Sequence, residues 1–502
     1  MAGGVMQLVA YGAQDIYLTG NPMITYFKIV YRRHTNFSIE SIEQTFNGRA
    51  DFGSKITSMI SRNGDLIHSI YLQLVLPDLT YTATSNSTIL RWTDDIGHHL
   101  IKEVSVDIGG QIIDVQSGDW MEIWAQLTVP AGKMPGYREM IGQDPRTAMG
   151  MNTGLQAGIP YVSETQDDPV ILIMPGREIY VPLQFWFCRN VGLALPLIAL
   201  QYHEVKINME LRNLSELIVA VDCNVNTGST TGTVTLNNIP TGHITDINLW
   251  VDYIYLDTDE RRRFAQVSHE YLIEQVQYTG ENTSIGGADL TLTLEFNHPV
   301  KELVWVCQFE SATSSYTRQY SNYTTISPII TMVGSEGLCG GISTIGDVEY
   351  DEPTTSAAAG AQTATNIRVF GNQSFSRPPG GTNIVSTACL TLNGNVRFAQ
   401  RAGEYFNWVQ CKNHHTNVPT SPGINVYSFA IHPETHQPSG TCNFSRVDVA
   451  KLILTFNQGL DALGSAGYSV AANFGSSNLK VRVYAFNYNI LRVMSGMGGL
   501  AY

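Results

Sequence analysis

Apolar and polar residues alternate along most of the chain, and this pattern predicts strands. The segment 290–296 (LTLTLEF) places Leu290, Leu292 and Phe296 on one face and polar residues on the other, which is the period of a half-buried strand. The segment 479–493 begins in the same way. Further strands are expected at 37–46, 55–61, 66–76, 100–108, 111–116, 178–187, 203–211, 246–257, 271–278, 301–308, 387–392, 395–400, 424–431 and 447–456.

Turn dipeptides separate these strands. Asn63-Gly64, Gly109-Gly110, Asn393-Gly394 and Pro379-Gly380 are typical of tight turns. Many short strands with frequent turns favour all-β sandwiches or barrels. Region 128–170 is weakly patterned, and we interpret it as a loop insertion.

Helices are predicted at few places. Val5, Leu8 and Val9 form a short apolar stripe near the N-terminus. Segment 257–266 (DTDERRRFAQ) has a cap residue, Asp257 or Thr258, followed by acidic residues, as at the start of a helix. Because this segment lies at the middle of the chain, it suits a connector between domains. Segment 118–127 is a further candidate for a helical turn.

One motif occurs in each half of the chain. GGQIIDVQSGDW at 109–120 and GNVRFAQRAGEY at 394–405 share two glycines, an acid and an aromatic residue. The strands before the turns align when Gly110 is placed over Gly394, whereas the acids Asp119 and Glu404 align only after one residue is inserted. A β-bulge would accommodate that residue.

A second pair of similar segments follows in the same order. Pro196 and Pro438 each lie nine residues before the first valine of a predicted strand, Val205 and Val447. Two pairs of similar segments in the same order suggest that one β-domain is present twice in the chain. We therefore expect an all-β chain of two consecutive eight-stranded jelly-roll barrels, with a short N-terminal helix and a short connector helix. Three such chains around an axis would place six similar barrels in a nearly hexagonal ring.

Length and charge agree with a multidomain assembly protein. At 502 residues the chain exceeds the roughly 250–300 residues that one core supports. Charged residues make up 15% of the chain, against about 25% in typical domains, which suggests extensive subunit contacts. The net charge of −14 argues against direct nucleic-acid binding.

The cysteines and the apolar segments indicate the kind of cellular compartment in which the chain is expected. The seven cysteines are scattered without a CxxC motif and are expected to be buried free thiols in a reducing compartment: Cys188, Cys223, Cys307, Cys339, Cys389, Cys411 and Cys442. No stretch reaches the roughly 18 apolar residues of a membrane span, and the N-terminus does not resemble a secretory signal.

Several long strings resemble the major capsid proteins of large algal and other nucleocytoplasmic DNA viruses. They are LVAYGAQDIYLTGNPMITYFKIVYRRHTNF (8–37), SRNGDLI (61–67), PGREIYVPLQFWF (175–187), GLALPLIALQYHEV (192–205), WVDYIYLDTDERRRFAQVSHEYLIEQ (250–275), QPSGTCNFSR (437–446) and NYNILRVMSGMGGLAY (487–502). The resemblance does not extend to 128–170, 221–242 and much of 310–386.

This resemblance implies a double jelly roll, homotrimeric pseudo-hexagonal capsomers and an icosahedral shell over an internal membrane. It also implies minor capsid and penton proteins as partners, and assembly in the host cytoplasm. Residues 1–26 would be an inward-facing segment, 27–257 the first jelly roll, 258–270 the connector helix and 271–502 the second jelly roll.

Candidate chemistry is weak everywhere. His432, Glu434 and His436 have HxxxH spacing, but the neighbouring prolines argue against a helical zinc site. The adjacent pairs His98-His99 and His414-His415 are expected to point to opposite faces of strands. We therefore predict no catalytic residues, no metal and no cofactor.

Two alternatives to a shell protein remain. The low-complexity segments 221–242 and 343–366 are expected to be surface loops. A jelly-roll glycan-binding or receptor-attachment protein could bind sugars with exposed loops such as 343–366. A glycan hydrolase would need two carboxylates roughly 5–10 Å apart, and Asp119 with Glu404 would be the first pair to test. The Asn-x-Ser/Thr sequons do not by themselves identify glycosylation sites; they lie at Asn36, Asn86, Asn213, Asn282, Asn322, Asn372 and Asn443.

Overall fold

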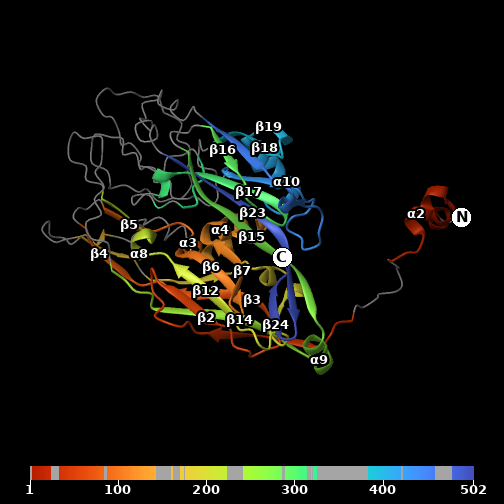
Figure 1. Cartoon of the computed structure of the whole chain (residues 1–502), viewed down its shortest axis with the longest axis horizontal. Coiled ribbons are helices and arrows are strands. Elements are labelled where there is room, and N and C mark those ends of the chain that lie inside the picture. Colours follow the sequence, from red (N-terminus) through yellow and green to blue (C-terminus); the bar gives the residue numbers. More distant parts are fainter. Residues whose placement is uncertain are drawn as a thin grey trace.

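The structure of the chain is a computed structural model. The residues that it describes are 3–23, 33–83, 88–142, 160–161, 170–174, 176–222, 241–284, 289–313, 318, 320–324, 383–419, 422–457 and 478–501. They form β-sheets with a few short helices (Figure 1). Of the expected loop at 221–242, residues 223–240 lie outside the described residues, and so does the whole expected loop at 343–366.

The first half folds into two facing sheets, which we call the first barrel. One sheet has the order β1-β14-β3-β10, with β11 added at β3, and the other has the order β2-β12-β6-β7. The strand bounds are β1 (Phe37–Gln44), β2 (Lys55–Met59), β3 (Leu66–Val75), β6 (Ile101–Ile108), β7 (Gln111–Ser117), β10 (Glu178–Pro182), β11 (Leu195–Pro196), β12 (Val205–Leu211) and β14 (Asp246–Leu256).

The second half repeats this arrangement, and we call it the second barrel. Its sheets have the orders β15-β23-β17-β20, with β21 added at β17, and β16-β22-β18-β19. The bounds are β15 (His269–Ser284), β16 (Leu290–Thr293), β17 (Pro299–Phe309), β18 (Val385–Leu392), β19 (Asn395–Ala402), β20 (Ile424–Ser428), β21 (Cys442–Asn443), β22 (Ala450–Phe456) and β23 (Leu479–Met494). The corresponding strands of the two barrels have the same order in their sheets, as the two pairs of similar sequence segments predict.

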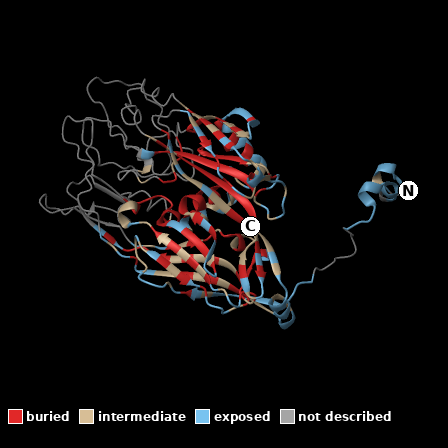
Figure 2. Ribbon diagram, in the orientation of Figure 1, coloured by how far each residue is buried: buried red, intermediate tan, exposed pale blue. Residues whose placement is uncertain are grey.

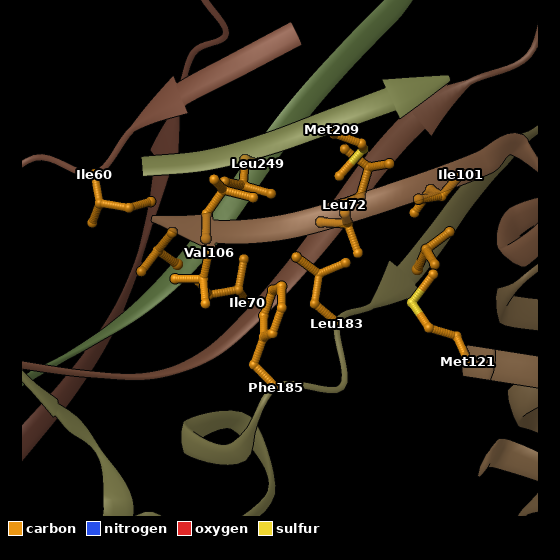
Figure 3. Packing of buried hydrophobic residues seen from close by; sticks show 14 of the residues in the cluster. Ile60, Ile70, Leu72, Ile101, Val106, Met121, Leu183, Phe185, Met209 and Leu249 are labelled. Atoms are coloured by element: carbon orange, nitrogen blue, oxygen red, sulfur yellow. The ribbon is translucent and has the colours of Figure 1, made fainter. Parts of the chain in front are cut away.

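Each barrel encloses its own hydrophobic core between its two sheets. In the first barrel Leu72 of β3 and Leu249 of β14 face Val106 of β6 and Met209 of β12 (Figure 3). The second core is built in the same way, with Trp305, Val483, Leu390 and Leu452 among its members. The buried residues therefore gather in the interior of the barrels, while exposed residues lie toward the outside (Figure 2).

The repeated glycine motif marks the same supersecondary unit in both barrels. Gly109-Gly110 and Asn393-Gly394 have positive φ at both positions, as a tight hairpin turn requires. They join β6 to β7 and β18 to β19. The first hairpin has one register shift, between Val106 and Asp107, whereas the second has two. This extra shift is the β-bulge that the sequence alignment predicts.

The predicted helices are also found. The connector is α9 (Thr258–Gln266), where the Asp257 carboxylate accepts a hydrogen bond from the Thr258 backbone N–H. Near the N-terminus α1 (Gly3–Val9) and α2 (Ile16–Thr19) carry exposed apolar side chains. The helix α4 (Gly118–Thr128) follows β7 directly.

Some elements were not expected from the sequence. Additional strands are β4 (Leu79–Ala83), β5 (Thr88–Trp92), β8 (Pro160–Tyr161), β9 (Val170–Met174), β13 (Ile218–Asp222) and β24 (Met497–Leu500). Additional helices are α3 (Ile96–Leu100), α5 (Met134–Met140), α7 (Trp186–Arg189), α8 (Leu214–Leu217) and α10 (Gln410–His414), with single turns η1 (Ala13–Asp15), η2 (Val191–Leu193), η4 (Glu310–Thr313), η5 (Tyr405–Val409) and η6 (Phe444–Arg446). The interpretation of 128–170 as a plain loop is therefore wrong, since α5, β8 and the start of β9 lie within it.

The end of the chain returns to the first barrel. β24 pairs with the end of β23, and Leu491 and Val493 of β23 belong to the first core. The Tyr202 backbone N–H donates to the Gly496 carbonyl oxygen over 2.9 Å. The final strands thus tie the second barrel to the first.

Candidate functional site: the joint between the two barrels

The helix α4 lies at the contact between the barrels. Its N-terminus is capped by Ser117, whose hydroxyl accepts a hydrogen bond from the Trp120 backbone N–H over 3.2 Å. A Cβ atom on Gly118 would lie 2.1 Å from the His98 carbonyl oxygen and 2.3 Å from that of Ile101. Only glycine allows the helix to start so close to the strand before the hairpin.

The two faces of α4 are buried against different barrels. Met121 points into the first core (Figure 3). Trp120, Ile123 and Trp124 belong instead to a separate apolar cluster with Tyr484 and other residues of the second barrel. A helix that follows the edge strand of one barrel therefore packs on the outer face of the other barrel's sheet.

Aromatic rings form the centre of this contact. The ring of Trp120 lies 5.2 Å from Tyr484, and that of Trp124 lies 4.8 Å from Phe486, measured between centroids. The Arg189 guanidinium lies 4.9 Å from the Trp124 ring and 4.8 Å from the Phe486 ring. Such rings bury large apolar areas, so they supply most of the energy of a contact of this kind.

A buried carboxylate joins charges from both barrels. Asp119 lies 3.1 Å from Arg482 of β23, 3.5 Å from Arg212 and 3.3 Å from His99. Burial alone would raise the pKa of Asp119, but Arg482 together with its other partners holds it well below the ordinary value. The carboxylate therefore stays charged between two guanidinium groups. Buried pairs of this kind favour one geometry, because any other arrangement leaves a charge unpaired.

The edge of β7 bonds directly to β15. The Val276 backbone N–H donates to the Asp114 carboxylate over 3.2 Å, and the Gln275 amide donates to the Ile113 carbonyl oxygen. Burial raises the pKa of Asp114 to about 6. Strand edge, helix and ion pairs together hold the two barrels in one relative orientation.

Two further buried polar groups support the joint. His98 of α3 contacts Glu122 over 2.6 Å and the Tyr137 hydroxyl over 2.9 Å. On the second barrel, the Lys301 ammonium donates to Glu274 over 2.6 Å. These groups have partners of opposite charge or hydrogen-bonding character, so their arrangement is structural and offers no free acid, base or nucleophile.

Comparison with known proteins identifies the family to which the chain belongs. A family profile described as "Major capsid protein N-terminus" matches residues 25–257, and one described as "Large eukaryotic DNA virus major capsid protein" matches residues 260–499. The chain belongs to the major capsid proteins of large eukaryotic DNA viruses.

Individual relatives agree over the full length of this major capsid protein. The major capsid protein of Phaeocystis pouchetii virus is 45% identical, and that of Paramecium bursaria Chlorella virus 1 is 40% identical, with 100% of both chains covered in each case. The solved structure of PBCV-1 VP54 matches with a TM-score of 0.65 and 35% identity over 95% of this chain and 100% of that chain. The Faustovirus major capsid protein, at 15% identity and a TM-score of 0.64, shares the fold.

These relatives confirm the all-β double jelly-roll class and a structural role in the virion capsid. This major capsid protein is not an enzyme, since its relatives are shell proteins. The two carboxylates suggested as a hydrolase pair, Asp119 and Glu404, also lie in different environments. Asp119 is buried in ion pairs, whereas Glu404 begins the corresponding helix of the other barrel and is exposed.

The histidine expectations need correction. His98 and His99 lie on α3, not on a strand, and both are buried with polar partners. His414 ends α10 and His415 follows it, so this pair is not on a strand either. A short helix was missed because the segment between two strands has no apolar period. His432 and His436 lie in an irregular segment, and the described residues contain no group of three possible metal ligands.

Other expectations are met in part. The five described cysteines are free, and Cys307 and Cys411 among them are fully buried. Cys223 and Cys339 lie outside the described residues. Trp186, expected on a strand, lies on α7 and is buried in the first core. Among the described residues, none of the helices has the length and apolar character needed to cross a membrane.

His415 is a buried cation of the second barrel. Its ring nitrogens lie 2.9 Å from Glu302 and 2.9 Å from Glu434. Burial alone would lower the pKa of His415, but the two carboxylates raise it to about 9. The native state therefore keeps a proton that the unfolded chain loses above a pKa of 6.5.

The stabilisation from His415 is expected to be complete below pH about 6.5 and to be lost as pH rises through about 9. His415→Gln should therefore lower the free energy of unfolding more at pH 6 than at pH 9.5. Urea unfolding of both proteins at the two pH values measures the difference. An equal loss at both values would show that the native His415 carries no extra proton.

Proposed function

We propose that this major capsid protein forms homotrimeric capsomers with a pseudo-hexagonal outline, and that these capsomers tile an icosahedral shell. The repetition of one strand order in both barrels carries this proposal. Three chains related by a three-fold axis present six barrels of similar shape, and closed cyclic symmetry is the usual outcome for homo-oligomers.

We further propose how the chain divides. Residues 1–26 form an inward-facing segment, 27–257 the first jelly roll, 258–270 the connector and 271–502 the second jelly roll. The end of the first profile match at residue 257 and the start of α9 at Thr258 support the boundary between the first jelly roll and the connector, whereas β15 begins at His269, two residues before the proposed start of the second jelly roll. The exposed apolar residues of the N-terminal segment, such as Leu8 and Leu18, suit a segment that is covered after assembly.

The proposed partners are other copies of the chain, minor capsid proteins and penton proteins, with an internal membrane nearby. The net charge of −14 supports the absence of direct nucleic-acid binding. Assembly in the host cytoplasm is proposed from the resemblance to the family alone.

The oligomeric state tests the capsomer proposal. We expect the purified chain to have the mass of three chains by light scattering and to show hexagonal outlines by electron microscopy. Obligate interfaces bury roughly 2,000–5,000 Å², so the trimer should persist on dilution. A stable monomer in dilute solution would contradict the proposal.

A further inference from the structure

The unit that makes the joint has a counterpart in the second barrel. After β19, the chain continues into η5 and α10, as it continues into α4 after β7. A Cβ atom on Gly403 would lie 2.1 Å from the carbonyl oxygen of Val385, the first residue of β18. Gly118 makes the same close approach to Ile101, the first residue of β6. The two glycines therefore place their helices equivalently.

The two helices have matching inner residues and contrasting outer residues. Aligned at the glycines, Met121 corresponds to Phe406, and each is buried in the core of its own barrel. Ile123 and Trp124, which pack on the second barrel, correspond to Trp408 and Val409. Trp408 and Val409 are each 43% exposed.

The strand edges show the same contrast. Asp114 and Gln116 of β7 are buried, and Asp114 accepts a hydrogen bond from the Val276 backbone N–H of β15. By the alignment at the glycines, they correspond to Ala399 and Arg401 of β19, which are exposed. Within the described residues, the second barrel therefore leaves partly exposed the surface that corresponds to the one by which the first barrel binds its neighbour.

The receiving surface has a partly exposed counterpart in the described part of the first barrel. In the second barrel, α4 covers the outer face of the sheet β15-β23-β17-β20. The equivalent sheet of the first barrel is β1-β14-β3-β10. Its outer face carries Tyr71, Tyr180 and Trp250, which alternate with core residues along their strands and are only partly buried.

The aromatic rings on this face lie close to one another. Tyr71 and Trp250 stack with centroids 6.3 Å apart and an interplanar angle of 8°, and Tyr180 lies 6.3 Å from Tyr71. At the sheet edge, Phe37 and Ile39 of β1 are 52% and 54% exposed. An aromatic face beside an apolar edge matches the exposed Trp408 and Val409 in chemistry.

We propose that Trp408 and Val409 of one subunit pack on the Tyr71, Tyr180 and Trp250 face of a second copy of this chain. This contact reproduces between chains the joint that α4 makes within one chain. The inference rests on the proposed homotrimer and names its interface. The donor surface, Trp408 and Val409, lies on the second barrel, whereas the receiver surface, Tyr71, Tyr180 and Trp250, lies on the first barrel. The contact is therefore heterologous, and three repeats of it close a ring.

Cross-linking through paired cysteines tests the contact. Trp408→Cys is combined in turn with Tyr71→Cys, Tyr180→Cys or Trp250→Cys, and each protein is treated with a short bis-maleimide. At least one pair is expected to give a covalent trimer on a denaturing gel. Trp408→Cys alone controls for the native cysteines and should give no trimer.

Negative charges introduced at Trp408 and Val409 test the contact independently, through the stability of the trimer. In the double variant Trp408→Glu and Val409→Glu, the trimer should dissociate at a protein concentration at least about tenfold higher than for the wild type. Val191→Glu is the matched control, because Val191 is 62% exposed and lies outside both surfaces. Light scattering over a dilution series measures each.

The outcomes separate the two proposals. A monomeric wild type would overturn the homotrimer and with it this interface. A trimeric wild type whose cysteine pairs give no covalent trimer, and whose double variant dissociates like the wild type, would overturn the interface alone. If the double variant does not fold, as judged by circular dichroism, the cysteine pairs decide.

Discussion

Asp119→Ala is expected to lower the free energy of unfolding by about 3–5 kcal/mol, because it removes one partner of a buried ion pair. Arg482 and Arg212 would remain largely buried without the carboxylate that lies 3.1 and 3.5 Å from them. His99 would lose its acidic neighbour as well. Urea unfolding followed by circular dichroism measures the change.

Two further variants make the Asp119 result specific. Glu295→Ala removes an exposed carboxylate of the second barrel and should change the stability by no more than about 0.5 kcal/mol. Asp119→Asn keeps the size of the side chain and should still be strongly destabilising, because it removes the charge. If Asp119→Ala and Glu295→Ala had equal effects, the ion pairs would not contribute to the joint.

Trp124→Ala is expected to cost about 3–5 kcal/mol, as the removal of a fully packed aromatic side chain does. Trp124 contacts the Phe486 ring at 4.8 Å and the Arg189 guanidinium at 4.9 Å, so its loss opens a cavity between the barrels. Since each barrel has its own core, we also expect unfolding to separate into two transitions when this contact is weakened.

Calorimetry and urea unfolding measure both effects. The matched control is Tyr17→Ala, which removes a ring that is 89% exposed and should change stability by no more than about 0.5 kcal/mol. A single unchanged transition in Trp124→Ala would show that the barrels are coupled elsewhere, for example through the end of β23.

The strands were predictable because they follow from local periodicity. Each predicted strand segment overlaps a strand of the two barrels, from β1 through β23, although the segment 178–187 ends in the helix α7. The hairpin turns at Gly109-Gly110 and Asn393-Gly394 were readable because positive φ at consecutive positions requires glycine or asparagine. The acidic start of α9 was equally local, since its cap is the adjacent Asp257.

Helices between strands and the roles of polar residues were harder to predict. The sequence indicated only a helical turn at α4, and it suggested its first acid, Asp119, as a catalytic candidate. Its true partner, Arg482, lies near the other end of the chain. Likewise, the pKa of His415 is raised by Glu302 and Glu434, which come from separate segments. No local pattern marks such pairs, because they depend on how two barrels are placed together.

The sequence by itself determined the strands, the repeated hairpin-and-helix unit, the midpoint connector and the membership of the viral capsid family. These follow from residues near one another in the chain, where alternation, turns and caps act. Only the tertiary structure decided that the two copies of this unit differ in use, with Trp124 buried against the second barrel and Trp408 left partly exposed. The physical reason is that burial depends on which surface a side chain meets, and that surface is built from distant parts of the chain.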